Sequence, residues 1–418
     1  MRVDRRRFLT SLLAAPLGSR LAAVAASGQY AAAIRSTRSK DHVVVVGAGA
    51  FGGWTALALL RAGAQVTLVD AWGAGNSRAS SGGETRVIRA VYGGERVYIE
   101  MVARALQLWR EEEQRWNRPV LTKTGALWMF GADNSAVTRS IEPMKAVGLR
   151  VEEMSPAEAS RRYSQISFNG VRSVFLEPEA GFLTARMACE LVRETFVREG
   201  GEYKVAWVRP GASAGGKMAS ISLSDGSSLD ADRFVFACGP WMGQLFPDVV
   251  GRRIVATRQE VFFFGTPAGD TRYDVGQMPV WLDFGKRIFY GIPGNERRGF
   301  KVADDTSGIE VNPTTMDRQP SAAGLARARA FLRLRFPTLA NAPLLEARVC
   351  QYEASSDGHY LVDRHPGLEN VWLVGGGSGH GFKMGPALGE HVAALVQGGA
   401  TPHPLFSYQR LRPRPKSG

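Results

Sequence analysis

Cysteine and histidine are scarce in this chain, and neither is spaced as a metal site requires. Three cysteines, Cys189, Cys238 and Cys350, occur among 418 residues, and their spacing matches no zinc site and no disulfide framework. The six histidines include no His-x-His or His-Glu-x-x-His pair. We therefore expect no bound metal, no reliance on disulfides and at least one free thiol.

Long apolar runs are also absent from the body of the sequence. No stretch of about 18 apolar residues follows the first 26 positions, so we expect no stable membrane span. Lysine and arginine together number 52 against 39 acidic residues, but they are scattered and form no stripe with interleaved aromatic side chains. This pattern disfavours nucleic-acid binding and predicts at most a loose attraction to anionic surfaces or substrates.

The first 25 residues differ from the rest of the chain. Arg5-Arg6-Arg7-Phe8-Leu9-Thr10 is a twin-arginine pattern, and short apolar segments and the small residues Ala23-Val24-Ala25 follow it. These three features predict a signal peptide over residues 1–25 and a linker over 26–41. They also predict that the twin-arginine machinery exports the protein to the periplasm or another extracytoplasmic location. Removal of five arginines and one aspartate would lower the formal net charge from +13 to +9. The alternative is a disordered basic tail.

A glycine fingerprint lies where a dinucleotide requires it. Gly47, Gly49 and Gly52 follow the apolar strand 43–46 and precede a helical run, so backbone amides at the helix start can approach a pyrophosphate. Asp70 ends the next strand, eighteen residues past the last glycine, where a carboxylate accepts from a ribose hydroxyl. This favours FAD or NAD over NADP. A Ser/Gly-rich turn that contains Ser80 follows, and such a turn can wrap a ligand closely.

A second glycine turn occurs near the C-terminus. Gly375 to Gly381 and Lys383 lie between the apolar strand 370–374 and a helix over 386–396, so the turn can stabilise negative charge. A reduced flavin carries that charge near N1 and the C2 carbonyl, so we expect Gly377, Gly379, Gly381 and Lys383 to bind the pyrimidine end of FAD. The alternative is a flexible surface loop with a solvated lysine.

The hydropathy pattern predicts an α/β fold in which a Rossmann-like FAD-binding domain is interleaved with an antiparallel-sheet substrate domain. Residues 233–239 form a continuous apolar strand of a buried parallel sheet, whereas residues 253–298 alternate as antiparallel strands do. The pattern also predicts a strand pair over 121–130 and an amphipathic helix over 181–198. The predicted FAD domain comprises residues 42–122, 180–252 and 342–397, the substrate domain 123–179 and 253–341, and a tail 398–418.

Arg86 and Arg89 are a third set of candidate site residues, and they follow the Ser/Gly-rich segment 80–84. Three residues apart, they would share one face of a helix, and each offers a planar fork to a carboxylate or phosphate. Taken alone they would more often be solvated surface charges.

These pieces together resemble the sarcosine oxidase and N-methyl-amino-acid oxidase group of the glycine/D-amino-acid oxidase flavoproteins, over about residues 42–397. The resemblance rests on the glycine fingerprint, Gly83 to Arg89, Tyr290-Gly291-Ile292-Pro293, Gly299-Phe300-Lys301, Cys350-x-Tyr352 and Ser378 to Lys383. It implies that Arg89 and Lys383 hold a substrate carboxylate, that Arg86 lies against the flavin, and that Tyr290 lines the substrate site. Lys301 takes the place of a lysine near flavin N5 whose charge favours electron transfer to oxygen.

Two further positions follow from the resemblance. Cys350 matches the cysteine that carries FAD through a thioether at the flavin 8-methyl; the alternative is a buried small hydrophobe, which is our interpretation of Cys189 and Cys238. Asp305 departs from the pattern, because sarcosine-type members carry a histidine there. A carboxylate would suit a substrate with an additional ammonium group, although a simple turn role is equally compatible with the local sequence.

The resemblance implies oxidation of the C–N bond of an amino acid or N-alkyl amino acid, with hydride transfer to flavin N5, hydrolysis of the imine, and reoxidation by O2 to give H2O2. Two alternatives stay open: a dehydrogenase that passes electrons to a quinone or another acceptor, and a non-catalytic flavin-binding scaffold. An NAD-linked enzyme is disfavoured by the second glycine turn and by the lack of a second nucleotide fingerprint.

Overall fold

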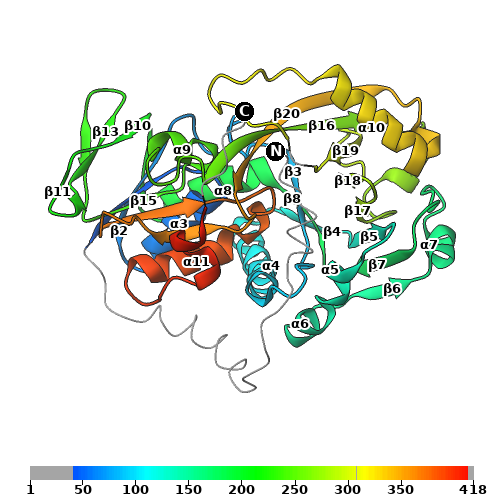
Figure 1. Cartoon of the computed structure of the whole chain (residues 1–418), viewed down its shortest axis with the longest axis horizontal. Coiled ribbons are helices and arrows are strands. Elements are labelled where there is room, and N and C mark those ends of the chain that lie inside the picture. Colours follow the sequence, from blue (N-terminus) through cyan, green and yellow to red (C-terminus); the bar gives the residue numbers. More distant parts are fainter. Residues whose placement is uncertain (1–40, 307, 413–418) are drawn as a thin grey trace. The chain divides into compact units, whose positions relative to one another are not determined.

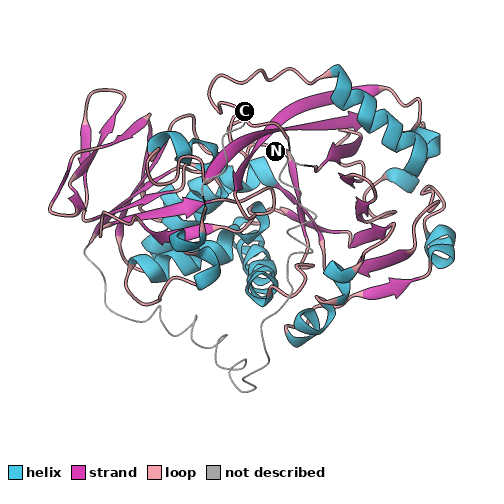
Figure 2. Ribbon diagram, in the orientation of Figure 1, coloured by secondary structure: helices cyan, strands magenta, loops and turns pink. Residues whose placement is uncertain are grey.

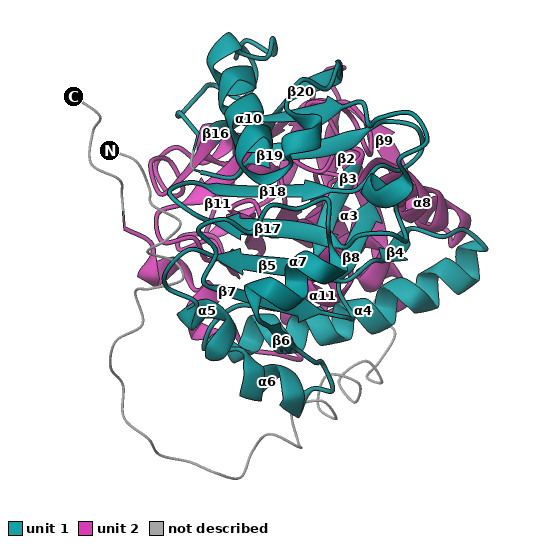
Figure 3. Cartoon of the chain, turned by 90° about the vertical axis from the view of Figure 1, so that its right-hand side faces the viewer, with its two compact units in different colours: residues 1–11, 85–184, 257–351 teal, residues 12–84, 185–256, 352–418 magenta. Residues whose placement is uncertain are grey.

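The computed structural model describes residues 41–306 and 308–412. The predicted signal peptide and all but the last residue of the predicted linker lie outside the described residues. The described chain forms two compact units, shown in separate colours in Figure 3. Unit 1 comprises residues 85–184 and 257–351, and unit 2 comprises residues 41–84, 185–256 and 352–412.

Unit 2 contains a six-stranded sheet in the order β21-β22-β15-β1-β2-β9. Strands β22, β15, β1, β2 and β9 are parallel to their neighbours, and β21 pairs antiparallel with β22. The central strand β1 (His42–Val46) is buried on both faces, as parallel strands covered by other elements are. The carboxyl ends of β1, β15 and β22 therefore lie at one edge of the sheet, and the two glycine turns leave from that edge.

Helices and a small sheet cover this parallel sheet. α3 packs against α8, α11 and β2 (Figure 1). Val44 and Val46 belong to a core with Ile221 of the β10-β13-β14 sheet and Phe246 after α9. The α/β architecture predicted from the sequence is confirmed, with apolar side chains on both faces of the central strands.

Figure 2 shows the helices and strands of both units. Unit 2 contains β1 (His42–Val46), α3 (Ala50–Arg61), β2 (Gln65–Asp70), α8 (Ala185–Arg198), β9 (Glu202–Val205), β10 (Val208–Pro210), β11 (Ser213–Ala214), β12 (Lys217–Met218), β13 (Ser220–Leu223), β14 (Ser228–Asp230), β15 (Arg233–Phe236), η2 (Gly239–Trp241), α9 (Met242–Leu245), β21 (Leu361–Arg364), β22 (Val371–Gly375), η5 (Phe382–Met384), α11 (Gly385–Val396), η6 (Pro404–Phe406) and η7 (Tyr408–Arg410).

Unit 1 is built on an eight-stranded sheet in the order β20-β16-β19-β18-β17-β5-β7-β6. Its strands pair antiparallel along β16-β19-β18-β17 and β5-β7-β6, whereas β17 and β5 are parallel. Helix α10 covers the sheet through Phe331, whose ring stacks on Phe289 at 4.2 Å and on Trp281 at 5.2 Å between centroids. Offset aromatic pairs of this kind add to the apolar area that the core buries.

A second sheet of unit 1, in the order β3-β8-β4, corrects three sequence predictions. Residues 85–88 form a strand that pairs with β8, so Arg86 and Arg89 do not share a helical face. The helix expected from residue 181 starts at Ala185, because Gly181–Thr184 is strand β8. The expected strand pair at 121–130 is two strands in different sheets, since β4 pairs with β8 and β5 with β17 and β7.

The remaining elements belong to unit 1, except that β16 and β20 run across its boundaries with unit 2. They are β3 (Thr85–Ile88), α4 (Arg96–Trp116), β4 (Leu121–Lys123), β5 (Ala126–Phe130), α5 (Ser135–Thr138), α6 (Ile141–Ala146), β6 (Glu152–Met154), α7 (Pro156–Arg162), β7 (Ser173–Glu177), β8 (Gly181–Thr184), β16 (Ile254–Phe264), η3 (Thr271–Tyr273), β17 (Val280–Phe284), β18 (Ile288–Ile292), β19 (Phe300–Asp304), α10 (Ala322–Arg335), η4 (Pro337–Leu339) and β20 (Leu344–Ser355).

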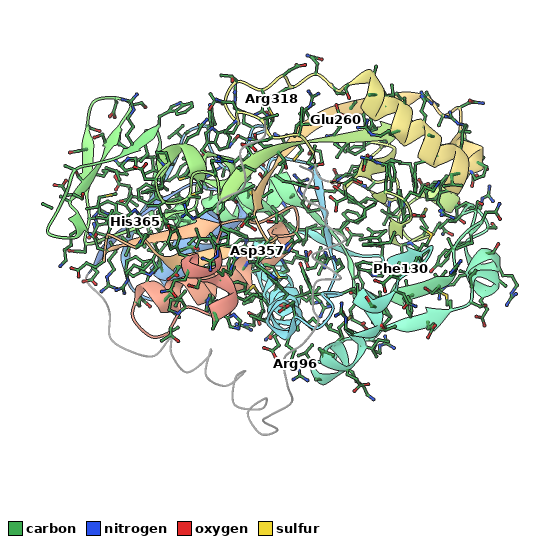
Figure 4. All side chains as sticks on the ribbon, viewed as in Figure 1. Arg96, Phe130, Glu260, Arg318, Asp357 and His365 are labelled. Carbon is green, nitrogen blue, oxygen red and sulfur yellow. The ribbon has the colours of Figure 1, made fainter. Side chains whose placement is uncertain are left out.

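The boundaries of the compact units differ from the predicted domain boundaries. Residues 85–122, assigned by the sequence to the FAD domain, belong to unit 1, because β3 and β4 both pair with β8. Residues 398–412 of the predicted tail pack into unit 2: Phe406 is fully buried, and Arg410 forms an ion pair with Asp357, which is labelled in Figure 4. Within the described ranges no helix has the length and apolar character needed to cross a bilayer.

Candidate FAD and substrate site

The first glycine turn of unit 2 has no room for side chains at two of its glycines. Gly47 has φ +105°, and a Cβ there would lie 2.3 Å from the carbonyl oxygen of Ala237. A Cβ at Gly52 would lie 1.8 Å from the carbonyl oxygen of Gly47. Gly49 is the N-cap of α3, so the first amides of that helix point out of the turn. Close backbone approach and the amides of a helix N-terminus are the features that bind a pyrophosphate.

Asp70 is fixed beside this turn by three backbone amides. Its Oδ2 accepts from Ala48 at 2.8 Å, and its Oδ1 accepts from Trp72 and Gly73 at 2.9 Å each. Burial raises the pKa of Asp70, and the three amide hydrogen bonds oppose that rise. A carboxylate offers about four acceptor sites, so one remains for a ribose hydroxyl. The residues present therefore fit the nucleotide end of FAD.

The Ser/Gly-rich turn after β2 contacts the glycine fingerprint through Ser81. The Oγ of Ser81 accepts from the amide of Ala50, in the first turn of α3, at 3.0 Å. The predicted ligand, Ser80, is its half-buried neighbour in the same turn. The sequence prediction missed Ser81, because two adjacent serines in a turn give no sign of which one points to the helix.

The second glycine turn follows β22 and leads into α11. Gly376 and Gly379 have φ +69° and +78°, which favours glycine at both positions. A Cβ at Gly381 would lie 2.6 Å from the ring of Phe51, and one at Gly377 would lie 3.6 Å from it. The buried Lys383 donates from Nζ to the carbonyl oxygen of His380 at 2.7 Å, so its ammonium is held on the turn itself.

Unit 1 brings Lys301, Arg86 and Cys350 together around Thr85. The Lys301 Nζ donates to the carbonyl oxygen of Thr85 at 3.1 Å and lies 3.3 Å from its hydroxyl. Arg86 donates to the same carbonyl oxygen at 2.8 Å and to the Cys350 Sγ at 3.5 Å. Lys301 is 1% exposed, so its position in the sheet is fixed by both packing and hydrogen bonds.

Arg89 follows β3 and is held by aromatic rings. Its guanidinium donates to the carbonyl oxygen of Val91 at 2.5 Å and lies 4.2 Å from the ring centre of Tyr92 and 5.5 Å from that of Trp128. A guanidinium over aromatic faces gains cation–π attraction while its fork stays oriented. The solvated surface charge considered for Arg89 is therefore not what the structure shows.

Glu177, which the sequence prediction missed, is a buried carboxyl group whose pKa the charge of this arginine lowers. It is 2% exposed, at the end of β7, and accepts from the amide of Ala90 and the indole N–H of Trp128 at 2.7 Å each. Burial raises the pKa of Glu177, and the Ala90 amide, the charge of Arg89 and the Trp128 indole oppose that rise. A lone acid at the end of an apolar strand, Ser173–Glu177, is the signal that could have identified it.

Tyr290 and Asp305 lie on the strands next to Lys301. Tyr290 is half-buried on β18, and the Lys301 Nζ lies 5.5 Å from its ring centre. Asp305 follows β19, and its amide donates to the carbonyl oxygen of Ile288 at 2.7 Å, which extends the pairing of β18 and β19. Its neighbour Asp304 is engaged by Arg287 and Arg327. The two aspartates thus have different surroundings.

Each unit therefore assembles its own part of the predicted residues. Unit 1 holds Arg86, Arg89, Tyr290, Lys301, Asp305 and Cys350, and unit 2 holds the two glycine turns, Asp70, Ser80 and Lys383. In the part of the chain that the structure describes, no group of three or more His, Cys, Asp or Glu side chains is arranged to hold a metal ion.

Comparison with known proteins gives one consistent result. The family model described as "DAO: FAD dependent oxidoreductase" matches residues 42–395. The chain is 29% identical over 376 residues to monomeric sarcosine oxidase of Bacillus sp. (strain B-0618), covering 89% of this chain and 96% of that protein. It is 27% identical over 378 residues to N-methyl-L-tryptophan oxidase of Salmonella heidelberg (strain SL476), with 87% and 96% covered. The fold matches L-proline dehydrogenase from P. horikoshii with a TM-score of 0.77 at 21% identity, covering 90% and 98%.

Proposed function

Because this chain belongs to the DAO family of FAD-dependent oxidoreductases, we propose that it oxidises the C–N bond of an amino acid or N-alkyl amino acid. Membership of this family establishes an enzyme and FAD as its cofactor. The observation that carries the proposal is the pair of fixed cations in unit 1, Arg89 on aromatic rings and Lys301 on Thr85. The names of two relatives, a sarcosine oxidase and an N-methyl-L-tryptophan oxidase, support this substrate class.

The proposed roles follow from the chemistry of each side chain. FAD, when bound, supplies the hydride acceptor for the C–N bond. Arg89 provides a planar fork for the substrate carboxylate. Holding the carboxylate in this way orients the carbon that loses hydride, and such positioning contributes much of the rate in enzymes of this kind. Tyr290 lines the substrate site beside Lys301.

An anaerobic titration of the purified yellow protein tests this function. We expect N-methyl amino acids, cyclic imino acids or D- or L-amino acids to bleach the flavin absorbance, and admission of air to restore it with formation of H2O2. Bleaching that persists in air would identify a dehydrogenase with a quinone or another acceptor instead. If no amine in the panel bleaches the flavin, the proposed function is wrong and a flavin-binding scaffold is favoured.

Cys350 is the residue we propose for covalent attachment of FAD. Its sulfur accepts a hydrogen bond from the Arg86 guanidinium at 3.5 Å, which fixes its position beside Arg86 in unit 1, and the Cys350-x-Tyr352 pattern supports this role. Cys350→Ser should release all of the flavin on acid precipitation, whereas the parent protein should keep yellow fluorescence in a denaturing gel. Cys189→Ser, at a buried helical position, serves as the control and should keep the flavin attached. Release from the parent protein as well would rule out the link.

Asp305 is proposed to select substrates that carry an additional ammonium group. Asp305→Asn removes the charge and keeps the size, so it should lower kcat/KM for diamino acids on the order of tenfold relative to neutral N-methyl amino acids. Asp317→Asn, an exposed site in the same unit, should leave the ratio unchanged. An unaltered substrate ranking in Asp305→Asn and Asp305→His would leave only the turn role.

Export through the twin-arginine pathway is proposed from Arg5 and Arg6. Replacing both with lysine keeps the charge and removes the twin-arginine pattern, so the protein should accumulate in the cytoplasm as an uncleaved chain. Cell fractionation and the N-terminal sequence of the mature protein measure this. Unchanged extracytoplasmic recovery of the lysine variant would contradict the proposal.

A further inference from the structure

Glu177, at the end of β7, forms hydrogen bonds to the two parts of unit 1 that hold Arg89. Its Oε2 accepts from the amide of Ala90 at 2.7 Å, and its Oε1 accepts from the indole N–H of Trp128 at 2.7 Å. Arg89 donates to the carbonyl oxygen of Val91 at 2.5 Å and lies 5.5 Å from the ring centre of Trp128. Glu177 therefore fixes the backbone next to Arg89 and one of the rings on which the guanidinium packs.

The backbone link between Glu177 and Arg89 passes through a single residue. Burial raises the pKa of Glu177, and hydrogen bonds from the amides of Ala90 and Val91 are among the interactions that lower it. The amide of Val91 thus donates to Glu177, whereas its carbonyl oxygen accepts from Arg89. A shift of the Glu177 carboxylate would therefore move the acceptor that holds the guanidinium.

One face of the eight-stranded sheet of unit 1 carries Glu177, Trp128, Tyr290 and Lys301. Paired residues of neighbouring strands project to the same face, as do residues two apart on one strand. The pairs that define the face are Glu177 with Ala126, Trp128 with Leu282, Leu282 with Tyr290, and Tyr290 with Ala303. Glu177 is therefore on the same face as the residues proposed for the substrate site, although it is only 2% exposed.

The position of Glu177 requires a side chain with two acceptor oxygens. Both oxygens accept from N–H groups, which have no acceptor capacity of their own. Glutamine offers one carbonyl oxygen and an NH2 group that only donates, so it can accept from Ala90 or from Trp128 but not from both. Aspartate keeps two acceptors but is one methylene shorter, so it reaches one donor at the expense of the other.

The second ring against Arg89 is held without Glu177. The guanidinium lies 4.2 Å from the ring centre of Tyr92. That ring stacks on Tyr98 of α4 with 4.8 Å between centroids, and the Tyr92 amide donates to the Ser140 Oγ at 3.0 Å. Loss of Glu177 should therefore loosen Arg89 on the side of Trp128 and leave the contact with Tyr92.

We propose that Glu177 is a positioning residue for Arg89, which it aligns by fixing residues 90–91 and the Trp128 ring. The inference rests on the proposed function, in which Arg89 binds the substrate carboxylate. Glu177 then acts on the reaction through Arg89 and sets how strongly the enzyme prefers a substrate with a carboxylate. Small displacements of a group that orients the substrate are costly, since a shift of about 1 Å reduces rates on the order of 100-fold.

Glu177→Gln tests this role through the choice of substrate. We expect kcat/KM for an amino-acid substrate to fall on the order of tenfold, mainly through KM, and that of the corresponding amine without the carboxylate to change less than about twofold. Glu177→Asp keeps the charge but not both hydrogen bonds, so it should show the same selective loss. Equal losses for both substrates in Glu177→Gln, or a parent-like Glu177→Asp, would overturn the proposal.

A crystal structure of Glu177→Gln measures the position of Arg89 without any turnover. The guanidinium should leave the Val91 carbonyl oxygen and the face of Trp128, and an unchanged guanidinium position would overturn the proposal. This readout separates the two hypotheses. If no amine bleaches the flavin of the parent protein, the proposed function is wrong, and the position of Arg89 in the variant still decides whether Glu177 aligns it.

Two further variants separate positioning from stability. Glu112→Gln removes another buried carboxylate of unit 1, in α4, where Glu112 pairs with Arg115, so it should leave the preference for carboxylate substrates unchanged. In an Arg89→Met background, Glu177→Gln should cause no further loss of that preference, because its effect passes through Arg89. A further loss would overturn the proposal. If Glu177→Gln does not fold, Glu177→Asp decides alone, by the same kinetics and the same guanidinium position.

Discussion

Lys301→Met should slow reoxidation of the reduced flavin by O2 on the order of 10²–10³-fold and leave its anaerobic reduction nearly unchanged. The first electron transfer to O2 creates superoxide, and a cation fixed in advance stabilises the anion at no cost of reorganisation. Lys301 is such a cation, because it is 1% exposed and bonded to the Thr85 carbonyl oxygen. Stopped-flow absorbance of the two half-reactions measures both rates.

The methionine variant is expected to fold. Methionine is apolar and flexible enough to fill the buried space, and the Thr85 carbonyl oxygen still accepts from Arg86 at 2.8 Å. Lys301→Arg should keep much of the oxygen reactivity, and Lys286→Met, at an exposed site of the same unit, should change neither half-reaction. Equal loss in both half-reactions would show that Lys301 serves substrate binding or folding and not oxygen.

Arg89→Met should lower kcat/KM for amino-acid substrates on the order of 10²–10³-fold, with a much smaller effect on the corresponding amine that lacks the carboxylate. Loss of one partner of a desolvated charge pair costs about 2–5 kcal/mol. Steady-state kinetics with each amino acid and its decarboxylated analogue measure the difference. An equal loss for both substrates would contradict a carboxylate-binding role.

A second variant separates binding from stability in this test. Arg89→Met leaves the buried Glu177 without its nearby positive charge, which is destabilising in itself. Arg89→Met combined with Glu177→Gln removes both charges. The Gln carbonyl oxygen can accept from the Ala90 amide, but the Gln NH2 then faces the Trp128 indole N–H, which loses its acceptor. The double variant should therefore recover part of the thermal stability but not the preference for carboxylate substrates. If it recovers that preference, Arg89 acts through the fold.

The α/β architecture could be predicted because its signals are local. An apolar strand, a glycine turn and a helix over residues 43–61 form one continuous pattern, and steric demand at Gly47 and Gly52 explains why glycine is used there. Period-2 alternation likewise identified the antiparallel strands of unit 1. Strand pairing was not predictable in the same way. β5 pairs in parallel with β17, whose residues lie more than 150 positions later in the sequence, and no local pattern encodes that choice.

The sequence by itself determined the first glycine turn, the acid that ends β2 and the positions of the cationic residues, because these depend on residue type and short spacing. Only the tertiary structure decided how those charges are held. Thr85 joins Lys301 to Arg86, and Tyr92 and Trp128 orient Arg89. The raised pKa of Glu177 was likewise decided by folding, because desolvation depends on what packs around a carboxyl group and not on its neighbours in sequence.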